Sequence, residues 1–262
     1  METFDVIVLG AGSAGVSAAL RASDQGAQVC IIEQEKIGGS CIHKGLYPLK
    51  FGLGLLRNNE SIFNINGRID SEKLFHKITD SMELLSELWE QRLTEAGVTI
   101  KIGSGLPLSS DLVQVSSNDK AFDIVTKKII IATGSSPVSL PTLPFEGDII
   151  VPVDDVFKNH SIPERVFIIG AGGHGCELSS FYQMLGSKVF LSSDHSRLFP
   201  DQDPEIKNNL EAPLNQINIH VTLLDENNHV ITIKETSSLV NTIMPGMKGP
   251  FDLILTNNEA KE

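Results

Sequence analysis

Two glycine-rich motifs of the same kind are the residues whose types and spacing best define a chemistry. They are Gly10-Ala11-Gly12-Ser13-Ala14-Gly15 and Gly170-Ala171-Gly172-Gly173-His174-Gly175. Each follows directly on a short apolar run, which is the order of strand, tight turn and helix in a dinucleotide-binding unit. The duplication predicts that the chain binds two dinucleotides.

Each glycine of the first motif has a separate predicted role. Gly10 permits the tight turn after the strand, Gly12 removes the Cβ that would block a pyrophosphate, and Gly15 lets helix and strand pack closely. Free N–H groups at the start of the helix then hold the anion. Glu33 follows Gly10 by 23 residues, close to the ~20 of the dinucleotide fingerprint. We therefore expect its carboxylate to bind the adenosine ribose.

The hydrophobic pattern predicts the elements that position these motifs. Strands are expected at residues 4–9, 28–32, 165–169, 188–192 and 251–256, with further short strands within 98–131. A helix is expected at 176–185. A long amphipathic helix is expected at 71–96, with Asp70 or Ser71 as its N-cap and Gly97 as its stop.

The composition argues against several classes of partner. The chain has 262 residues, a net charge of −12 and 41% hydrophobic residues, enough for one large or two modest cores. The excess of acidic residues argues against nucleic acid and anionic membranes. No stretch approaches the ~18 apolar residues of a membrane span. The start Met1-Glu2-Thr3 lacks the basic region of a signal peptide, and three cysteines without an export signal indicate a reduced, cytoplasmic protein.

The order of further motifs along the chain is specific. After the first unit come Gly38-Gly39-Ser40-Cys41-Ile42-His43-Lys44-Gly45-Leu46-Tyr47-Pro48-Leu49-Lys50, then Ala132-Thr133-Gly134, then the second glycine motif with Glu177. In this order the chain resembles the pyridine nucleotide-disulfide oxidoreductases, most of all their dihydrolipoamide dehydrogenase branch, from residue 5 to about 256. In that family the first motif binds FAD and the second binds NAD(H) or NADP(H).

The resemblance implies the fold class and the domains. The class is α/β, with two Rossmann-like dinucleotide-binding domains of three-layer ββα/β-meander architecture. An FAD-binding domain is expected at 1–145 and an NAD(P)-binding domain at 146–262, joined by the proline-rich crossing at 135–146. Both are expected to be incomplete, because the second FAD segment and the C-terminal dimerisation domain of the family are absent from the sequence. A homo-oligomer or another protein partner remains open.

The resemblance also implies site residues, position by position. Those for FAD are Gly10, Gly12, Ser13, Ala14, Gly15, Glu33, Ser40, Cys41, Lys50, Gly105, Thr133 and Gly134. Those for the nicotinamide cofactor are Gly170, Gly172, Gly173, His174, Gly175 and Ser193. Cys41, Lys50 and Glu177 are the candidate catalytic residues, and no metal site is expected. In the family the lysine approaches the flavin and pairs with the glutamate, which would tune the flavin. An ordinary ion pair between domains is the equally open alternative.

One departure from the family concerns its redox centre. The family has two cysteines spaced Cys-x-x-x-x-Cys, and here Cys41 is followed at the second position by Leu46. Cys41 therefore cannot form the disulfide that exchanges electrons with the flavin, and disulfide reductase activity is not expected. Cys30, in a predicted buried strand, and Cys176, in a predicted helix, offer no replacement. Cys41 is either a reactive thiol or a packed small residue.

Other departures concern the nicotinamide site. Where family members have an aromatic residue over the nicotinamide, this sequence has Gly173-His174. His174 is either an acid or base, or a neighbour of the phosphates. Ser193 stands where the acidic ribose partner is expected, Asp194 would repel a 2′-phosphate and Arg197 would attract one. The choice between NAD(H) and NADP(H) stays open.

Two classes of function remain. The first is an FAD-dependent NAD(P)H oxidoreductase without a redox-active disulfide, which passes electrons to oxygen, a quinone or a dye. The second is a degenerate, non-catalytic paralogue that binds nucleotide weakly and acts through protein contacts.

Overall fold

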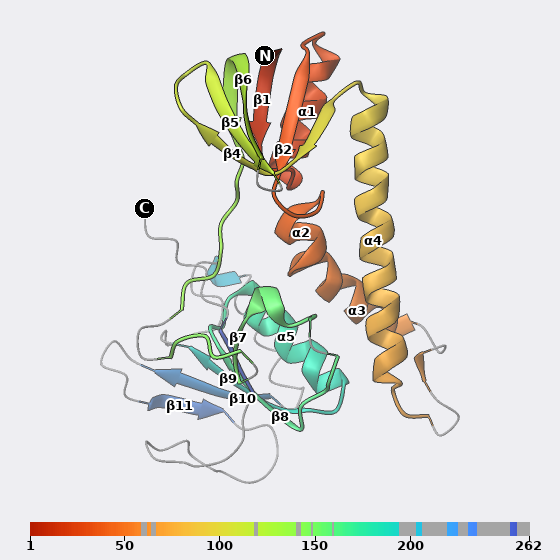
Figure 1. The fold of residues 1–262 in the computed structure, drawn as a ribbon. Helices are drawn as coiled ribbons and strands as arrows, with labels where there is room; N and C mark the ends of the chain where they lie inside the picture. Colours follow the sequence, from red (N-terminus) through yellow and green to blue (C-terminus); the bar gives the residue numbers. More distant parts are fainter. Residues whose placement is uncertain are drawn as a thin grey trace. The chain divides into compact units, whose positions relative to one another are not determined.

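The computed structural model describes residues 1–58, 62–63, 67–117, 120–139, 143–147, 149–158, 160–193, 203–205, 219–224, 230–234 and 252–255. Its contacts divide the chain into two units, residues 1–48 with 77–136 and residues 49–76 with 137–262. Each unit contains one six-stranded sheet (Figure 1). The domain limits predicted at residues 145 and 146 stay predictions.

The first unit contains a mostly parallel sheet with a meander at one edge. Its strands are β1 (Glu2–Leu9), β2 (Val29–Glu33), β3 (Thr99–Ile102), β4 (Ser104–Pro107), β5 (Leu112–Ser117) and β6 (Lys120–Ile131). They lie in the order β3-β2-β1-β6-β5-β4. β3, β2, β1 and β6 pair in parallel, whereas β6, β5 and β4 pair antiparallel. The strands predicted for this half of the chain are confirmed.

Both faces of this sheet are buried, which explains the nearly continuous apolar runs of β1 and β2. Side chains alternate between the faces along a strand, so Val8 packs in one cluster and Ile7 and Leu9 in another. The first cluster includes residues of α1 (Ser13–Asp24) and α4 (Ser71–Glu95), and the second includes Val113 and Val115 of β5. Helices, parallel sheet and meander thus form the three expected layers.

The predicted limits of the long helix are confirmed. The Lys73 N–H donates to Asp70 Oδ1 at 3.1 Å, which makes Asp70 the N-cap of α4. Gly97 has a φ of +76° just after the helix ends, the conformation that favours glycine at a helix end. Two helices were not predicted, α2 (Gly39–His43) and α3 (Leu46–Asn58). Pro48 is tolerated because it lies in the first turn of α3, where no N–H has a partner within the helix.

The second unit is built on another mostly parallel sheet. Its strands are β7 (Ile150–Pro152), β8 (Arg165–Ile169), β9 (Lys188–Ser193), β10 (Ile219–Leu224), β11 (Val230–Lys234) and β12 (Asp252–Leu255), with a short 3-10 helix η2 (Val153–Asp155). The order is β11-β10-β9-β8-β12-β7, and all neighbours pair in parallel except β10 and β11. Helix α5 (Gly173–Met184) begins three residues before the predicted helix, because the last residues of the second glycine motif form its first turn.

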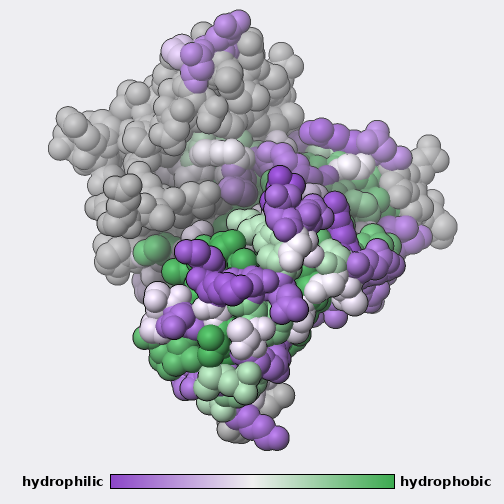
Figure 2. All heavy atoms as spheres, turned by 90° about the horizontal axis from the view of Figure 1, so that it is seen from above, coloured by the Kyte–Doolittle hydropathy of each residue, from purple (hydrophilic) through white to green (hydrophobic). Residues whose placement is uncertain are grey.

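The surface mixes charged and apolar residues. On the face seen in Figure 2, hydrophilic side chains are interspersed with apolar ones over the described residues. Within the described ranges, no helix combines the length and the apolar character that crossing a bilayer requires.

Candidate dinucleotide sites

The first glycine motif forms a turn whose three glycines are in different surroundings. Gly10 has a φ of +96°, and a Cβ on it or on Gly15 would overlap backbone carbonyl oxygens, of Ala132 and Gly10 respectively. A Cβ on Gly12, in contrast, would meet nothing closer than Gly39 Cα at 4.0 Å. The outer two glycines are therefore required by the fold itself, whereas Gly12 borders open space.

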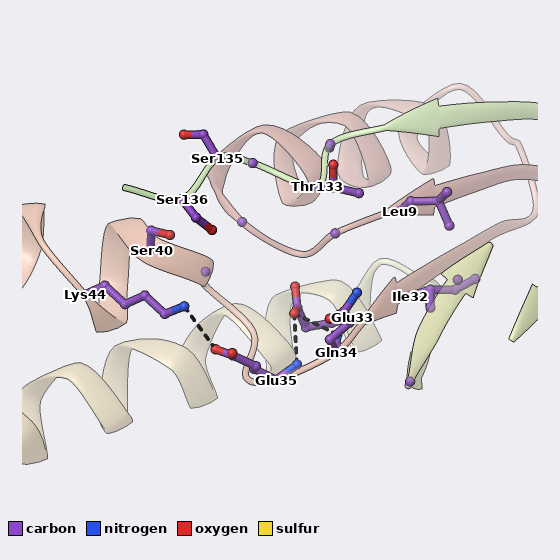
Figure 3. A pocket seen from close by; sticks show the side chains of 17 residues that line it. Leu9, Ile32, Glu33, Gln34, Glu35, Ser40, Lys44, Thr133, Ser135 and Ser136 are labelled. Carbon is purple, nitrogen blue, oxygen red and sulfur yellow. Dashed lines mark hydrogen bonds and ion pairs between the residues drawn. The ribbon is translucent and has the colours of Figure 1, made fainter. Parts of the chain in front are cut away.

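A cavity of about 220 Å³ lies in front of this turn, within the first unit (Figure 3). Helix α1 begins after Gly12 without a side-chain cap, so its first N–H groups are available to an anion. Predicted FAD residues that line the cavity are Gly10, Gly12, Glu33, Ser40, Gly105, Thr133 and Gly134. Ser13, Ala14 and Gly15 lie in the first turn of α1. The seven lining residues come from segments far apart in the sequence, and the fold brings them to one cavity.

Glu33 is held at the end of β2 by backbone donors. The Ala11 N–H donates to its Oε2 at 2.6 Å, while the N–H groups of Gln34 and Glu35 donate to its Oε1 at 2.8 and 3.0 Å. A carboxylate can accept about four hydrogen bonds. One acceptor position therefore remains for a hydroxyl in the cavity.

Gly105 is required by packing as well as by the cavity. A Cβ on this residue of β4 would lie 2.7 Å from Leu9 Cδ2, closer than side chains pack. Thr133 and Gly134 follow β6, at the carboxyl ends of the parallel strands. In open α/β sheets, ligands bind at this edge.

Several lining residues were missed by the sequence analysis. They are Gln34, Glu35, Lys44, Ser135 and Ser136. Ser135 and Ser136 continue directly from Thr133-Gly134, and Lys44 lies inside the 38–50 motif, so proximity to predicted residues was the available signal. Lys44 Nζ lies 3.4 Å from Glu35 Oε2.

The three cysteines are free thiols. Burial raises the pKa of Cys30 and of Cys176 to about 12, and both side chains are buried. Cys41, in α2, is half-buried, and burial raises its pKa too. Leu46, at the family's second cysteine position, is 41% exposed at the start of α3. A raised pKa keeps each thiol protonated near neutral pH and therefore weakly nucleophilic.

The second glycine motif repeats the first. Gly170 has a φ of +105° and its N–H donates to Ser192 O at 2.9 Å, as the Gly10 N–H donates to Ile32 O at 2.8 Å. Helix α5 begins after Gly172 without a side-chain cap, and a Cβ on Gly172 or Gly173 would meet nothing within 4 Å. This start of α5 is therefore equally open to an anion.

The other predicted nicotinamide residues are placed as follows. His174 and Gly175 lie in the first turn of α5, and Ser193 is the last residue of β9. Asp194 and Arg197 lie outside the described residues. The roles of these residues stay predictions.

Lys50 and Glu177 form an ion pair within the second unit, from α3 to α5. The Lys50 side chain is 52% exposed and that of Glu177 31% exposed. Such exposed pairs contribute only about 0.2–1 kcal/mol to stability, so stability alone is a weak reason for this pair.

Two glycine turns, each between a parallel strand and an uncapped helix start, define a protein with two dinucleotide-binding folds. The family model described as pyridine nucleotide-disulphide oxidoreductase matches residues 4–248, and the chain belongs to this family.

Individual relatives agree with this assignment. A dihydrolipoyl dehydrogenase from Buchnera aphidicola is 30% identical over 258 residues, which cover 89% of this chain and 53% of the relative. A mercuric reductase from Staphylococcus aureus is 27% identical over 81% of this chain and 40% of the relative. The solved HOCl-induced flavoprotein disulfide reductase RclA from Escherichia coli has a TM-score of 0.74 at 20% identity, over 97% of this chain and 56% of that one, a likeness of fold. The chain thus spans about half the length of these relatives.

Proposed function

We propose that this chain binds FAD at the first glycine motif and NAD(H) or NADP(H) at the second, as an NAD(P)H oxidoreductase without a redox-active disulfide. One observation supports FAD binding above the others. The space that a Cβ on Gly12 would occupy is open, and it borders a cavity that Glu33 and the start of α1 also reach.

The residues of the first unit fit a dinucleotide. The uncapped N–H groups of α1 suit a pyrophosphate, and the remaining acceptor position of Glu33 suits a ribose hydroxyl. Ser40, Thr133 and Ser135 add hydroxyl groups to the cavity lining. Bound FAD would supply the hydride-accepting centre, and the chain supplies binding and orientation.

The proposed electron acceptor is a small molecule such as oxygen, a quinone or a dye. Leu46 cannot form a disulfide with Cys41, and the raised pKa of Cys41 makes its thiol a poor nucleophile. A dithiol route through positions 41 and 46 is therefore closed. We also propose that the protein is located in the cytoplasm.

The second candidate function is a non-catalytic paralogue that binds nucleotide weakly and acts through protein contacts. The substitution at Leu46 favours it, and so does Gly173, which has no side chain of its own to cover a nicotinamide ring. In this case the folds would be retained and turnover lost.

The visible spectrum of the purified protein separates the two functions. Under the enzyme proposal the protein contains, or can be reconstituted with, about one FAD per chain, and NADH or NADPH bleaches the flavin band. FAD that binds without bleaching supports the non-catalytic paralogue. A colourless protein that FAD cannot reconstitute contradicts the flavoenzyme proposal.

A further inference from the structure

Lys44 gives the cavity of the first unit a cation that the family resemblance does not call for. Among the described residues that line this cavity, it is the only lysine, arginine or histidine, while Glu33 and Glu35 both contribute carboxylates. A pyrophosphate entering this space brings further negative charge. The other described lining residues could offset that charge only with backbone N–H groups and neutral side chains.

The position of Lys44 is fixed by the backbone and its side chain by Glu35. The Lys44 N–H donates to Ser40 O at 3.0 Å, which closes the last turn of α2. Its Nζ extends toward Glu35 Oε2, at 3.4 Å (Figure 3). Glu33 is occupied by three backbone N–H groups and forms no ion pair with Lys44 among the described residues.

Little free energy is needed for Lys44 to leave Glu35 and pair with another anion. The Glu35 side chain is 70% exposed, whereas that of Lys44 is 30% exposed. An exposed carboxylate is well solvated and binds an ammonium group weakly. A phosphate oxygen inside the cavity forms a stronger, charge-assisted hydrogen bond, and the flexible lysine side chain can move to it.

We propose that Lys44 determines the affinity of the first site for dinucleotides, by leaving Glu35 and pairing with the pyrophosphate of the bound ligand. This proposal rests on the proposed FAD site and names one residue that sets its strength. In the free protein, Glu35 competes with the ligand for the same ammonium group. Removal of either partner should therefore change affinity, in opposite directions.

The experiment is a titration of the flavin-free 262-residue chain with FAD, followed by flavin fluorescence. Lys44→Met should weaken binding roughly tenfold, the loss expected for one charge-assisted contact. Glu35→Gln should strengthen it by about twofold to fivefold, because it frees the ammonium group. The double variant should match Lys44→Met. The dependence of affinity on salt should be smaller in Lys44→Met than in the wild type.

Lys36→Met is the matched control. Lys36 also forms an ion pair, with Glu83 at 3.3 Å, but it does not line the cavity. Its loss changes the net charge equally, so general electrostatics would affect both lysine variants alike. Lys44→Arg should keep most of the wild-type affinity.

The outcomes separate this inference from the proposed function. Wild-type protein that does not bind FAD contradicts both. Wild-type protein that binds FAD, with Lys44→Met equal to Lys36→Met, overturns only the role of Lys44. If Lys44→Met fails to fold, Glu35→Gln still decides, because unchanged or weaker binding in that variant overturns the exchange.

Discussion

The glycines of the first turn show how a single missing side chain can serve either the fold or the ligand. Gly10 and Gly15 are crowded by backbone atoms, and Gly10 also has a positive φ. Gly12 has open space in the direction of its absent side chain. The sequence motif predicts separate roles for the three glycines, and the crowding at Gly10 and Gly15 agrees with the packing roles. The role of Gly12 toward a ligand stays a prediction.

Gly10→Ala and Gly12→Ala should therefore fail in different ways. Gly10→Ala should lower the free energy of unfolding by about 1–3 kcal/mol or more, through backbone strain and overlap with Ala132 O. Gly12→Ala should change it by less than about 0.5 kcal/mol but weaken FAD binding at least tenfold. Urea unfolding and FAD titration of both variants test this. Equal destabilisation by the two substitutions would contradict the distinction.

Because of the buried thiols, we expect the free energy of unfolding to change with pH in the alkaline range. Burial raises the pKa of Cys30 and of Cys176 from 9.0 to about 12. Between these values the unfolded chain loses the thiol protons and the folded chain keeps them, so folding stability falls as pH rises. The expected slope is at most about 1.4 kcal/mol per pH unit for each thiol. Urea unfolding at pH 8.5 and 10.5 measures how much the free energy of unfolding falls between these two pH values. The fall should be smaller in Cys30→Ala than in the wild type, which serves as the control.

At the scale of elements, the geometry between helices α2 and α3 decides whether residues 41 and 46 can be joined by a disulfide. Helices α2 and α3 contain both family cysteine positions, with Cys41 in α2 and Leu46 at the first residue of α3. Both positions lie in the first unit. If these two helices keep the family's geometry, a cysteine at position 46 should reach Cys41.

Leu46→Cys tests that geometry directly. After mild oxidation the variant should lose two free thiols per chain, measured under denaturing conditions, because an internal disulfide forms. Tyr47→Cys is the control, since residue 47 is 40% exposed in the same turn but one position off the family spacing. If the variant keeps the thiols at positions 41 and 46 after oxidation and stays monomeric, the two helices have diverged from the family's geometry.

The cap of α4 gives a second prediction for an element. Asp70→Ala removes the acceptor of the Lys73 N–H and should cost about 0.5–2 kcal/mol of stability. Ser71→Ala, one residue later, should change stability by less than about 0.5 kcal/mol. Thermal or urea unfolding of the two variants compares them. Equal effects would mean that Asp70 does not act as the cap.

Much of the first unit could be predicted from sequence because its signals are local. The apolar runs of β1 and β2, the glycine turn and Asp70 each depend on neighbours in the chain. Helix α3 could not be predicted, because Pro48, Gly52 and Gly54 disfavour helix. Its helical state depends on burial of Leu49, Leu53 and Leu56, which are 1%, 7% and 7% exposed. Lys44 was missed because its contact with Glu35 depends on how the chain folds back after β2.

At the scale of the whole molecule, the fold repeats one six-stranded sheet unit, and the ion pair of Lys50 and Glu177 lies within the second unit. In the second sheet, β12 lies between β7 and β8 although it is the last of the described strands along the chain. Helix α3 begins in the first unit and continues into the second, where Lys50 meets Glu177. The family resemblance implies that this lysine approaches the flavin, so under the proposed function the ion pair would act on hydride transfer.

Lys50→Met should therefore affect hydride transfer more than folding. Both side chains of the pair are partly exposed, so its loss should cost less than about 1 kcal/mol of stability. Under the proposed function, Lys50→Met and Glu177→Gln should each slow bleaching of bound FAD by NADH about tenfold or more, and the double variant should be no slower than Lys50→Met.

Lys158→Met is the control for this experiment. Lys158 pairs with Asp155 at 2.6 Å in the same unit, and its side chain is 69% exposed. Its loss removes one surface ion pair and one positive charge, as Lys50→Met does, but at a position outside the family's redox motifs. If all three single variants bleach at the wild-type rate, the pair of Lys50 and Glu177 is an ordinary structural contact. The other outcome is that only the Lys50 and Glu177 variants bleach slowly, while their unfolding midpoints match that of Lys158→Met. In that case the pair acts on the flavin, because equal stability excludes loss of folding as the cause of the slower bleaching.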